Sequence, residues 1–320
     1  MTTMRTHYAL LLTVGAMLAF ANTARADGDK NLLMVQPLRD HPVHKIMQAG
    51  FLDRCKALGY TCEVVGNPSA TVYDVPGTIP LADAALSRTK YGAVAVYGPD
   101  PSIFPYISKL ARDGYPVVTW HVMPKEGTVK GLVAATGEDV AQAGSNAADA
   151  MGNKLGGKGA VAVTEGSYNL IENTMASSFK QELNAKYPDI KVLDPQTEGF
   201  EPSAAKSKAV SILQGNPDVT GAFSTTGNGP ETWSGAARTA GRQITIIAMD
   251  YVRQNLDLVK SGAVYGLVAQ PLYEEGAKAA DLAVALAEGK TVPYYNTLPA
   301  KVITAPDLDP YYAILKSAGQ

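Results

Sequence analysis

The chain has 320 residues, of which 46% are hydrophobic and 18% are charged. This length and composition are those of a globular protein with one large or two ordinary domains, and they exclude a disordered, collagenous or disulfide-dense chain. The formal net charge is −2 and the basic residues form no run. We therefore expect no nucleic acid and no anionic membrane surface as partner.

The first 26 residues predict a secretory signal peptide. Arg5 and His7 precede an apolar stretch over 8–21, and the motif Ala-Arg-Ala over 24–26 places small residues at a cleavage site. The apolar stretch is too short and wrongly flanked for a helix that spans a membrane. We expect cleavage after residue 26 and export of the mature chain, most simply to a bacterial periplasm.

Short continuous apolar runs predict strands that are buried on both faces of a parallel sheet. These runs lie at 32–35, 93–97, 117–120, 160–163, 244–249 and 265–269, and helical patterns follow over 42–58, 101–113, 138–155, 170–186, 202–214, 230–240, 251–261 and 272–288. The alternation predicts a doubly wound α/β fold. A break near 124–136 indicates a crossing between two similar halves.

Two cysteines lie close together in this pattern. Cys55 falls near the end of the first helix and Cys62 early in the strand that follows it. In an oxidising compartment the pair can form a disulfide, which would stabilise the fold by about 2–3 kcal/mol. Alternatively, Cys55 is a small apolar residue on the buried stripe of its helix. The Cα separation decides between these interpretations, and the sequence leaves both open.

Five segments in register carry a resemblance to a known family. They are Leu33–Val35 with Asp40–Pro42, the turn and strand over 114–121, the segment over 155–163, Ile246–Asp250 and Val268–Gly276. Over 30–305 the chain resembles the ribose-binding-protein-like (type I) periplasmic solute-binding proteins of sugar ABC transporters. The resemblance implies two similar α/β lobes joined by a three-segment hinge that closes on one small ligand. It implies an N-lobe of 27–134 plus 271–297 and a C-lobe of 135–270 plus 298–320.

Ligands of open parallel sheets bind beyond the carboxyl ends of the strands, and polar and aromatic residues gather at these ends here. Carboxylates and amides can bind vicinal hydroxyls in pairs, while aromatic rings supply flat apolar faces for a sugar ring. We expect the ligand to contact Asp40, His41, Tyr97, Trp120, His121, Tyr168, Asn173, Asn228, Asp250 and Gln270.

For several of these residues, a structural role is an alternative to contact with the ligand. Asp40 and Asp250 can cap the helices that begin after them, and Gln270 can bind backbone groups at the hinge. Trp120 can be a core residue. Asn173 stands one turn into its helix, where the resemblance implies an arginine in sugar-binding relatives, and its role stays open.

The chain departs from the ribose-type pattern where that pattern has arginine. After the Val-Val-Thr strand it has His121 and Val122 in place of an acid and an arginine, and Val43 and His44 replace an aromatic pair. A pocket without arginine is neutral to slightly acidic. It favours a neutral sugar or polyol, or a cationic amino sugar, over a sugar acid or phosphate.

Other chemistries are weaker. His41 and His44 would suit a metal, but no further cysteine or histidine lies nearby, so we expect no metal and no cofactor. The glycine-rich segment 152–159 runs from helix to strand, unlike a phosphate loop, and no G-x-S-x-G elbow is present.

We expect a monomeric, non-enzymatic binding protein that delivers a monosaccharide or sugar alcohol to an inner-membrane ABC permease. The alternatives are an exported carbohydrate-active enzyme and a sugar sensor that serves a chemoreceptor.

Overall fold

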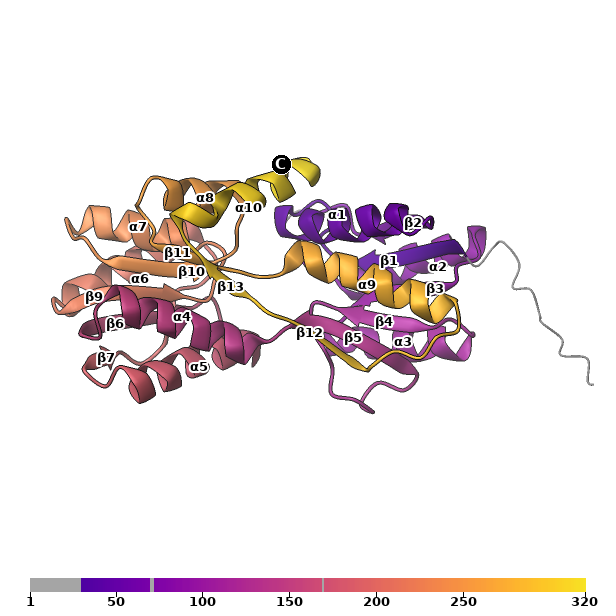
Figure 1. The fold of residues 1–320 in the computed structure, drawn as a ribbon, viewed down its shortest axis with the longest axis horizontal. Helices are drawn as coiled ribbons and strands as arrows, with labels where there is room; N and C mark the ends of the chain where they lie inside the picture. The colour runs from indigo at the N-terminus through magenta and orange to yellow at the C-terminus, as the bar shows by residue number, and fades with distance from the viewer. Residues whose placement is uncertain (1–29, 70–71, 169) are drawn as a thin grey trace, which may run out of the picture.

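The structure is a computed structural model that describes residues 30–69, 72–168 and 170–320. Two lobes stand side by side, each built on its own sheet (Figure 1). The predicted two-lobed α/β fold is confirmed. The predicted signal peptide over 1–26 lies outside the described residues. Within the described ranges, no helix has the length and apolar character needed to cross a membrane.

The first lobe contains a six-stranded sheet in the order β12-β5-β4-β3-β1-β2, and every pairing in it is parallel. Its elements are β1 (Asn31–Gln36), α1 (Pro42–Ala57), β2 (Thr61–Gly66), α2 (Ile79–Arg88), β3 (Ala93–Tyr97), α3 (Phe104–Arg112), β4 (Val117–Trp120), β5 (Leu132–Glu138), α9 (Leu272–Ala287) and β12 (Tyr295–Leu298). The strand order reverses at β1. Right-handed crossovers therefore place α1 on one face of the sheet and α2 and α3 on the other.

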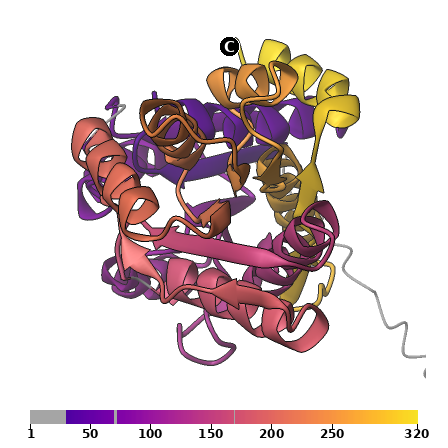
Figure 2. The same cartoon turned by 90° about the vertical axis from the view of Figure 1, so that its left-hand side faces the viewer.

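The second lobe contains the sheet β13-β11-β10-β9-β6-β7, with β8 beside β6. Its elements are α4 (Val140–Lys154), β6 (Gly159–Glu165), α5 (Leu170–Lys186), β7 (Ile190–Val192), β8 (Gln196–Thr197), α6 (Pro202–Gly215), β9 (Val219–Ser224), α7 (Gly229–Thr239), β10 (Thr245–Met249), α8 (Arg253–Lys260), β11 (Gly266–Ala269), β13 (Lys301–Ile303) and α10 (Leu308–Ser317). Among the described strands only β13 runs antiparallel to its neighbour. Figure 2 shows this lobe end-on, with helices on both sides of the sheet.

The chain crosses between the two sheets three times: after β5, after β11 and after β12. The first crossing leads into α4, the second into α9 and the third into β13. Parallel strands of both sheets end toward these crossings, so the turns that follow the strands of one lobe face those of the other. This arrangement places the candidate binding residues around one gap.

The structure contains two helices and several strands that the sequence analysis did not predict. In α2, the two buried residues are alanines, so the segment has no stripe of large apolar side chains. In β9, Gly221 and Thr220 interrupt the apolar run, and a Cβ on Gly221 would lie 2.8 Å from the sulfur of Met151. These elements form because of their packing partners rather than their own hydrophobic pattern.

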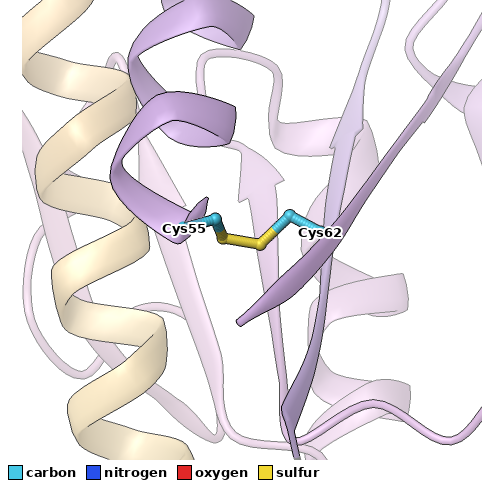
Figure 3. Close-up of a disulfide and its surroundings, with 2 residues drawn as sticks. All are labelled: Cys55 and Cys62. Carbon is cyan, nitrogen blue, oxygen red and sulfur yellow. A yellow bond between two sulfur atoms is a disulfide. The ribbon is translucent and has the colours of Figure 1, made fainter. Parts of the chain in front are cut away.

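Cys55 at the end of α1 and Cys62 in β2 form a disulfide (Figure 3). Their Cα atoms lie 6.2 Å apart, within the range that a disulfide can bridge. Cys55 is also buried against the core of the first lobe. Both interpretations that the sequence left open therefore hold for this residue. The bond ties the edge strand β2 to the helix before it.

Helices α1 and α9 pack with their backbones in direct contact because each offers a glycine to the other. A Cβ on Gly276 of α9 would overlap the carbonyl oxygen of Met47, and a Cβ on Gly50 of α1 would overlap that of Tyr273. Since α9 begins directly after the second crossing, this contact fixes the start of α9 against the first lobe.

We predict that Gly276→Ala lowers the free energy of unfolding by about 2–3 kcal/mol, because the added methyl group must push two backbones apart. Gly235→Ala is the matched control: Gly235 also lies in a helix, but a Cβ there meets only the Lys206 side chain at 3.5 Å. Alanine there should leave stability equal or raise it by up to about 1 kcal/mol. Urea unfolding of both variants measures the effect, and equal midpoints would contradict the prediction.

Candidate functional site

A cavity of about 1020 Å³ lies between the lobes at the carboxyl ends of both sheets. The first lobe lines it with Leu38, His41, Tyr73, Tyr97, Pro99, His121 and Val122, and the second lobe with Ser167, Leu170, Ile171, Glu172, Met175, Phe200, Thr225, Asn228, Met249, Asp250 and Gln270. The cavity is at the upper end of the size range of small-molecule sites. Among the described residues, the lining contains neither lysine nor arginine.

Three non-glycine residues of the described chain have a left-handed backbone, and all three line this cavity. They are Leu38 with φ of 50°, His121 with φ of 74° and Asp250 with φ of 67°. Each lies shortly after a strand end, where the chain turns sharply. Such a conformation costs an L-residue on the order of 1–3 kcal/mol and persists only where the surroundings impose it. The backbone strain of the described chain is thus concentrated at the cavity.

Six of the residues predicted from the sequence line the cavity: His41, Tyr97, His121, Asn228, Asp250 and Gln270. The capping alternative for Asp250 does not apply, because α8 begins after Val252 and has no side-chain cap. Tyr97 is both buried and part of the lining. Gln270 lies where the chain leaves the second lobe for α9.

The other four predicted residues do not line the cavity. Asp40 is exposed beside Arg39, and Asn173 and Tyr168 are exposed, Tyr168 to 65%. Trp120 is fully buried, with its ring 5.0 Å from that of Tyr97 in an edge-on contact. The pleat of β4 explains this position, since successive side chains of a strand point to opposite sides. Trp120 therefore supports the lining from behind, while the next residue, His121, reaches the cavity.

Two buried acids, which were not predicted from the sequence, approach the cavity from behind. Glu138 ends β5, and Glu275 lies in the first turn of α9 with 0% exposure. A signal for Glu275 exists in the sequence: it falls on the apolar stripe that contains Leu272 and Ala279, where a solvated acid is not expected. No comparable signal marks Tyr73, which joins the lining from the loop after β2.

These acids belong to a buried polar cluster that spans the first and second crossings. Nδ1 of His121 lies 3.0 Å from Oε2 of Glu275, and Nε2 of Gln270 donates a hydrogen bond to Oε1 of Glu138. The second oxygen of each glutamate and Oδ1 of Asp250 are buried without a hydrogen-bond partner in the described chain. Unpartnered buried acceptors are costly, so these atoms favour the approach of hydrogen-bond donors.

Burial changes the protonation of this cluster. It raises the pKa of Glu138 to about 7, and the charge of Glu275 adds to the effect. It also raises the pKa of Asp250 to about 6, against the opposing influence of His121. Burial alone would lower the pKa of His121, but the charge and hydrogen bond of Glu275 outweigh it and raise that pKa. Burial lowers the pKa of His44 to about 3, so this neighbouring imidazole is neutral.

The lining combines hydrogen-bonding groups with aromatic faces. Tyr97 stacks on His121 with ring centroids 5.7 Å apart and planes inclined by 17°, and Tyr73 packs edge-on against Tyr97. This arrangement can bind a hydroxyl-rich ligand on its edges and its flat side. Within the described ranges, no group of three His, Cys, Asp or Glu side chains could hold a metal ion.

Comparisons with known proteins agree with this architecture. The family model described as "Periplasmic binding protein domain" matches residues 32–291. A xylitol-binding protein of Mycolicibacterium smegmatis is 26% identical over 241 residues, which are 74% of this chain and 67% of that protein. A sugar-binding protein of a sugar ABC transporter from Bacillus halodurans has a similar structure, with a TM-score of 0.81 at 25% identity over 88% of this chain and all of that one. An arabinose-binding protein from Geobacillus stearothermophilus reaches 0.80 at 25% identity, over 89% and 99%. The family resemblance drawn from the sequence is confirmed.

We predict that Glu138→Gln stabilises the ligand-free protein at alkaline pH. The folded state holds a proton on Glu138 up to a pH of about 7, whereas an unfolded glutamate releases it near 4.5. Through this group the wild type therefore loses stability as the pH rises through this window, and the variant, which keeps the acceptor for Gln270, lacks this contribution. The difference should grow from near zero at pH 4.5 to about 1–3 kcal/mol at pH 8.

Urea unfolding between pH 4.5 and 8 checks this difference. Glu126→Gln is the control, because Glu126 is exposed and its substitution should change stability equally at every pH. A Glu138→Gln difference that is independent of pH would show that Glu138 has the same pKa in the folded and the unfolded chain, and would contradict the prediction.

Proposed function

Since the chain belongs to the periplasmic binding protein family, whose members are non-enzymatic solute-binding proteins, we propose that it is an exported protein that binds a small neutral sugar or sugar alcohol and delivers it to an ABC permease. The observation that carries the proposal is the interlobe cavity, whose described lining has carboxylate, amide and aromatic groups but neither lysine nor arginine. A sugar acid or phosphate would require such cations. Two relatives are named as binding proteins for xylitol and for arabinose. The first compound is a sugar alcohol and the second a sugar, and both are uncharged.

The proposed mechanism is closure of the two lobes about the three crossings. We propose the lobe division 27–134 plus 271–297 and 135–270 plus 298–320, except that β5 and β12 continue in the first sheet to Glu138 and Leu298. A ligand that contacts residues of both lobes stabilises the closed state by its differential affinity for that state. The closed form is then the one that a permease, or a chemoreceptor, would bind.

A thermal-shift screen of mature residues 27–320 tests the proposal. The probes are xylitol, D-arabinose, D-ribose, D-galactose, myo-inositol and glucosamine, with ribose 5-phosphate as the anionic comparison. At least one neutral polyol should raise the melting temperature in a saturable way and be recovered unchanged, whereas the phosphate should not. Turnover of a probe, or stabilisation by the phosphate alone, would contradict the proposal.

We predict that Asp250→Ala weakens binding of the best neutral probe by tenfold or more. Asp250 is the second-lobe carboxylate whose buried Oδ1 has no partner, and loss of an acceptor for a buried hydroxyl costs about 1–3 kcal/mol. Titration calorimetry measures the affinity. Asp309→Ala, at an exposed position of α10, should bind normally. Normal binding by Asp250→Ala would remove this residue from the site.

Export gives a separate prediction. Expression of the full chain in a bacterial host should yield a periplasmic protein whose first residue is Asp27, because the Ala-Arg-Ala motif precedes it. Intact-mass analysis of the periplasmic fraction determines the terminus. A cytoplasmic product that retains residues 1–26 would contradict the proposed location.

A further inference from the structure

His121 and Glu275 form a pair that the proposed function does not by itself require. We infer that Glu275 is a positioning residue that holds His121 as a charged N–H donor, so that the site selects a ligand hydroxyl placed between His121 of the first lobe and Asp250 of the second. This inference rests on the proposed function and names the class of ligand more closely: neutral polyols rather than amino sugars.

The geometry holds the imidazole on two sides. Its plane stacks on Tyr97, and its Nδ1 lies 3.0 Å from Oε2 of Glu275. Because Glu275 is fully buried behind the lining, Nδ1 points away from the cavity. Nε2 is then the ring nitrogen that is left for a ligand, and it makes no hydrogen bond within the described chain.

Glu275 itself cannot move away from this position. It precedes Gly276, whose backbone is in direct contact with α1, so the first turn of α9 is fixed. A buried carboxylate without a cation is strongly unfavourable, and His121 is the cationic side chain that contacts it. Burial of Glu275 and protonation of His121 therefore support each other.

The other titratable groups around His121 favour the same charge state. Glu138 of β5 and Asp250 after β10 both raise its pKa, in addition to Glu275 of α9. His44 of α1 faces it as a neutral ring, and burial keeps Tyr97 of β3 neutral as well. His41, the other imidazole of the lining, has its pKa lowered by burial. His121 is thus the charged donor of the described lining.

A hydroxyl suits the space between His121 and Asp250 because it accepts from the first and donates to the second. An ammonium group has donors only, so it can bind Asp250 but is repelled by the charged imidazole. The pair therefore discriminates against an ammonium group at this position, although the cavity contains acids, and so against an amino sugar that would place its ammonium there.

Nuclear magnetic resonance titration of the ligand-free protein tests the pair directly. Residues 27–320 contain three histidines, His41, His44 and His121, and His121→Gln assigns the signal of interest. In the wild type, His121 should titrate above 6.5 and protonate at both nitrogens. In Glu275→Gln, which keeps an acceptor for Nδ1, its pKa should fall, because the largest influence that opposes burial is removed. The control Glu274→Gln, one residue away, should leave it unchanged.

A wild-type pKa below 6.5, or an equal pKa in Glu275→Gln, would overturn the inference. If Glu275→Gln does not fold, the wild-type titration alone decides, because it reports the charge of His121 without any variant.

Calorimetry with xylitol and D-arabinose between pH 6 and 9.5 supplies the second readout. Affinity of the wild type should decrease as the pH rises and His121 loses its proton, while Glu275→Gln should bind about tenfold more weakly at the low end of this range and show a smaller decrease. Glucosamine should bind the wild type at least tenfold more weakly than the better neutral probe. Tighter binding of glucosamine would overturn the inference.

If the screen finds no sugar or polyol that binds, the proposed function fails, whereas the titration of His121 still decides whether the pair exists.

Discussion

The backbone contact between α1 and α9 determines where the groups of the site can lie. Gly50 and Gly276 allow the two helices to approach until backbone meets backbone, and this approach positions the first turn of α9. Glu275 lies in that turn, one residue before Gly276, and Gln270 lies just ahead of the helix. A larger residue at the contact would displace both side chains from His121 and Glu138. Stability of the first lobe and the geometry of the site therefore depend on the same pair of glycines.

The site concentrates features that are uncommon elsewhere in the described chain. It contains the three non-glycine residues of the described ranges that have a left-handed backbone, and several of its buried carboxyl oxygens have no hydrogen-bond partner there. The cores of the two lobes, with large side chains such as Trp233, Phe179 and Phe51 fully buried, supply the stability that these features cost. A bound hydroxyl would provide the missing partner for Asp250, so part of the binding energy is already present in the ligand-free protein as unfavourable burial.

Much of the fold could be predicted from the sequence because the buried parallel strands have continuous apolar runs. The ends of those strands also predicted His121, Asp250 and Gln270 as neighbours, since all parallel strands of a sheet end on one side. Trp120 illustrates the limit of this reasoning: the position at a strand end was predicted, but the direction of its side chain depends on the pleat. Glu275 illustrates another limit, because its role depends on a helix contact between segments more than 200 residues apart.

The order of the strands also has a consequence for how the chain can complete its fold. β12 covers the edge of β5 in one sheet, and β13 covers the edge of β11 in the other, yet both strands come from 295–303. Until this short segment is in place, β5 and β11 are the edge strands of their sheets, and exposed edges invite pairing with other chains. Residues 295–303 therefore shift the edge of both sheets outward together, so a disturbance of this one segment exposes β5 and β11 at once.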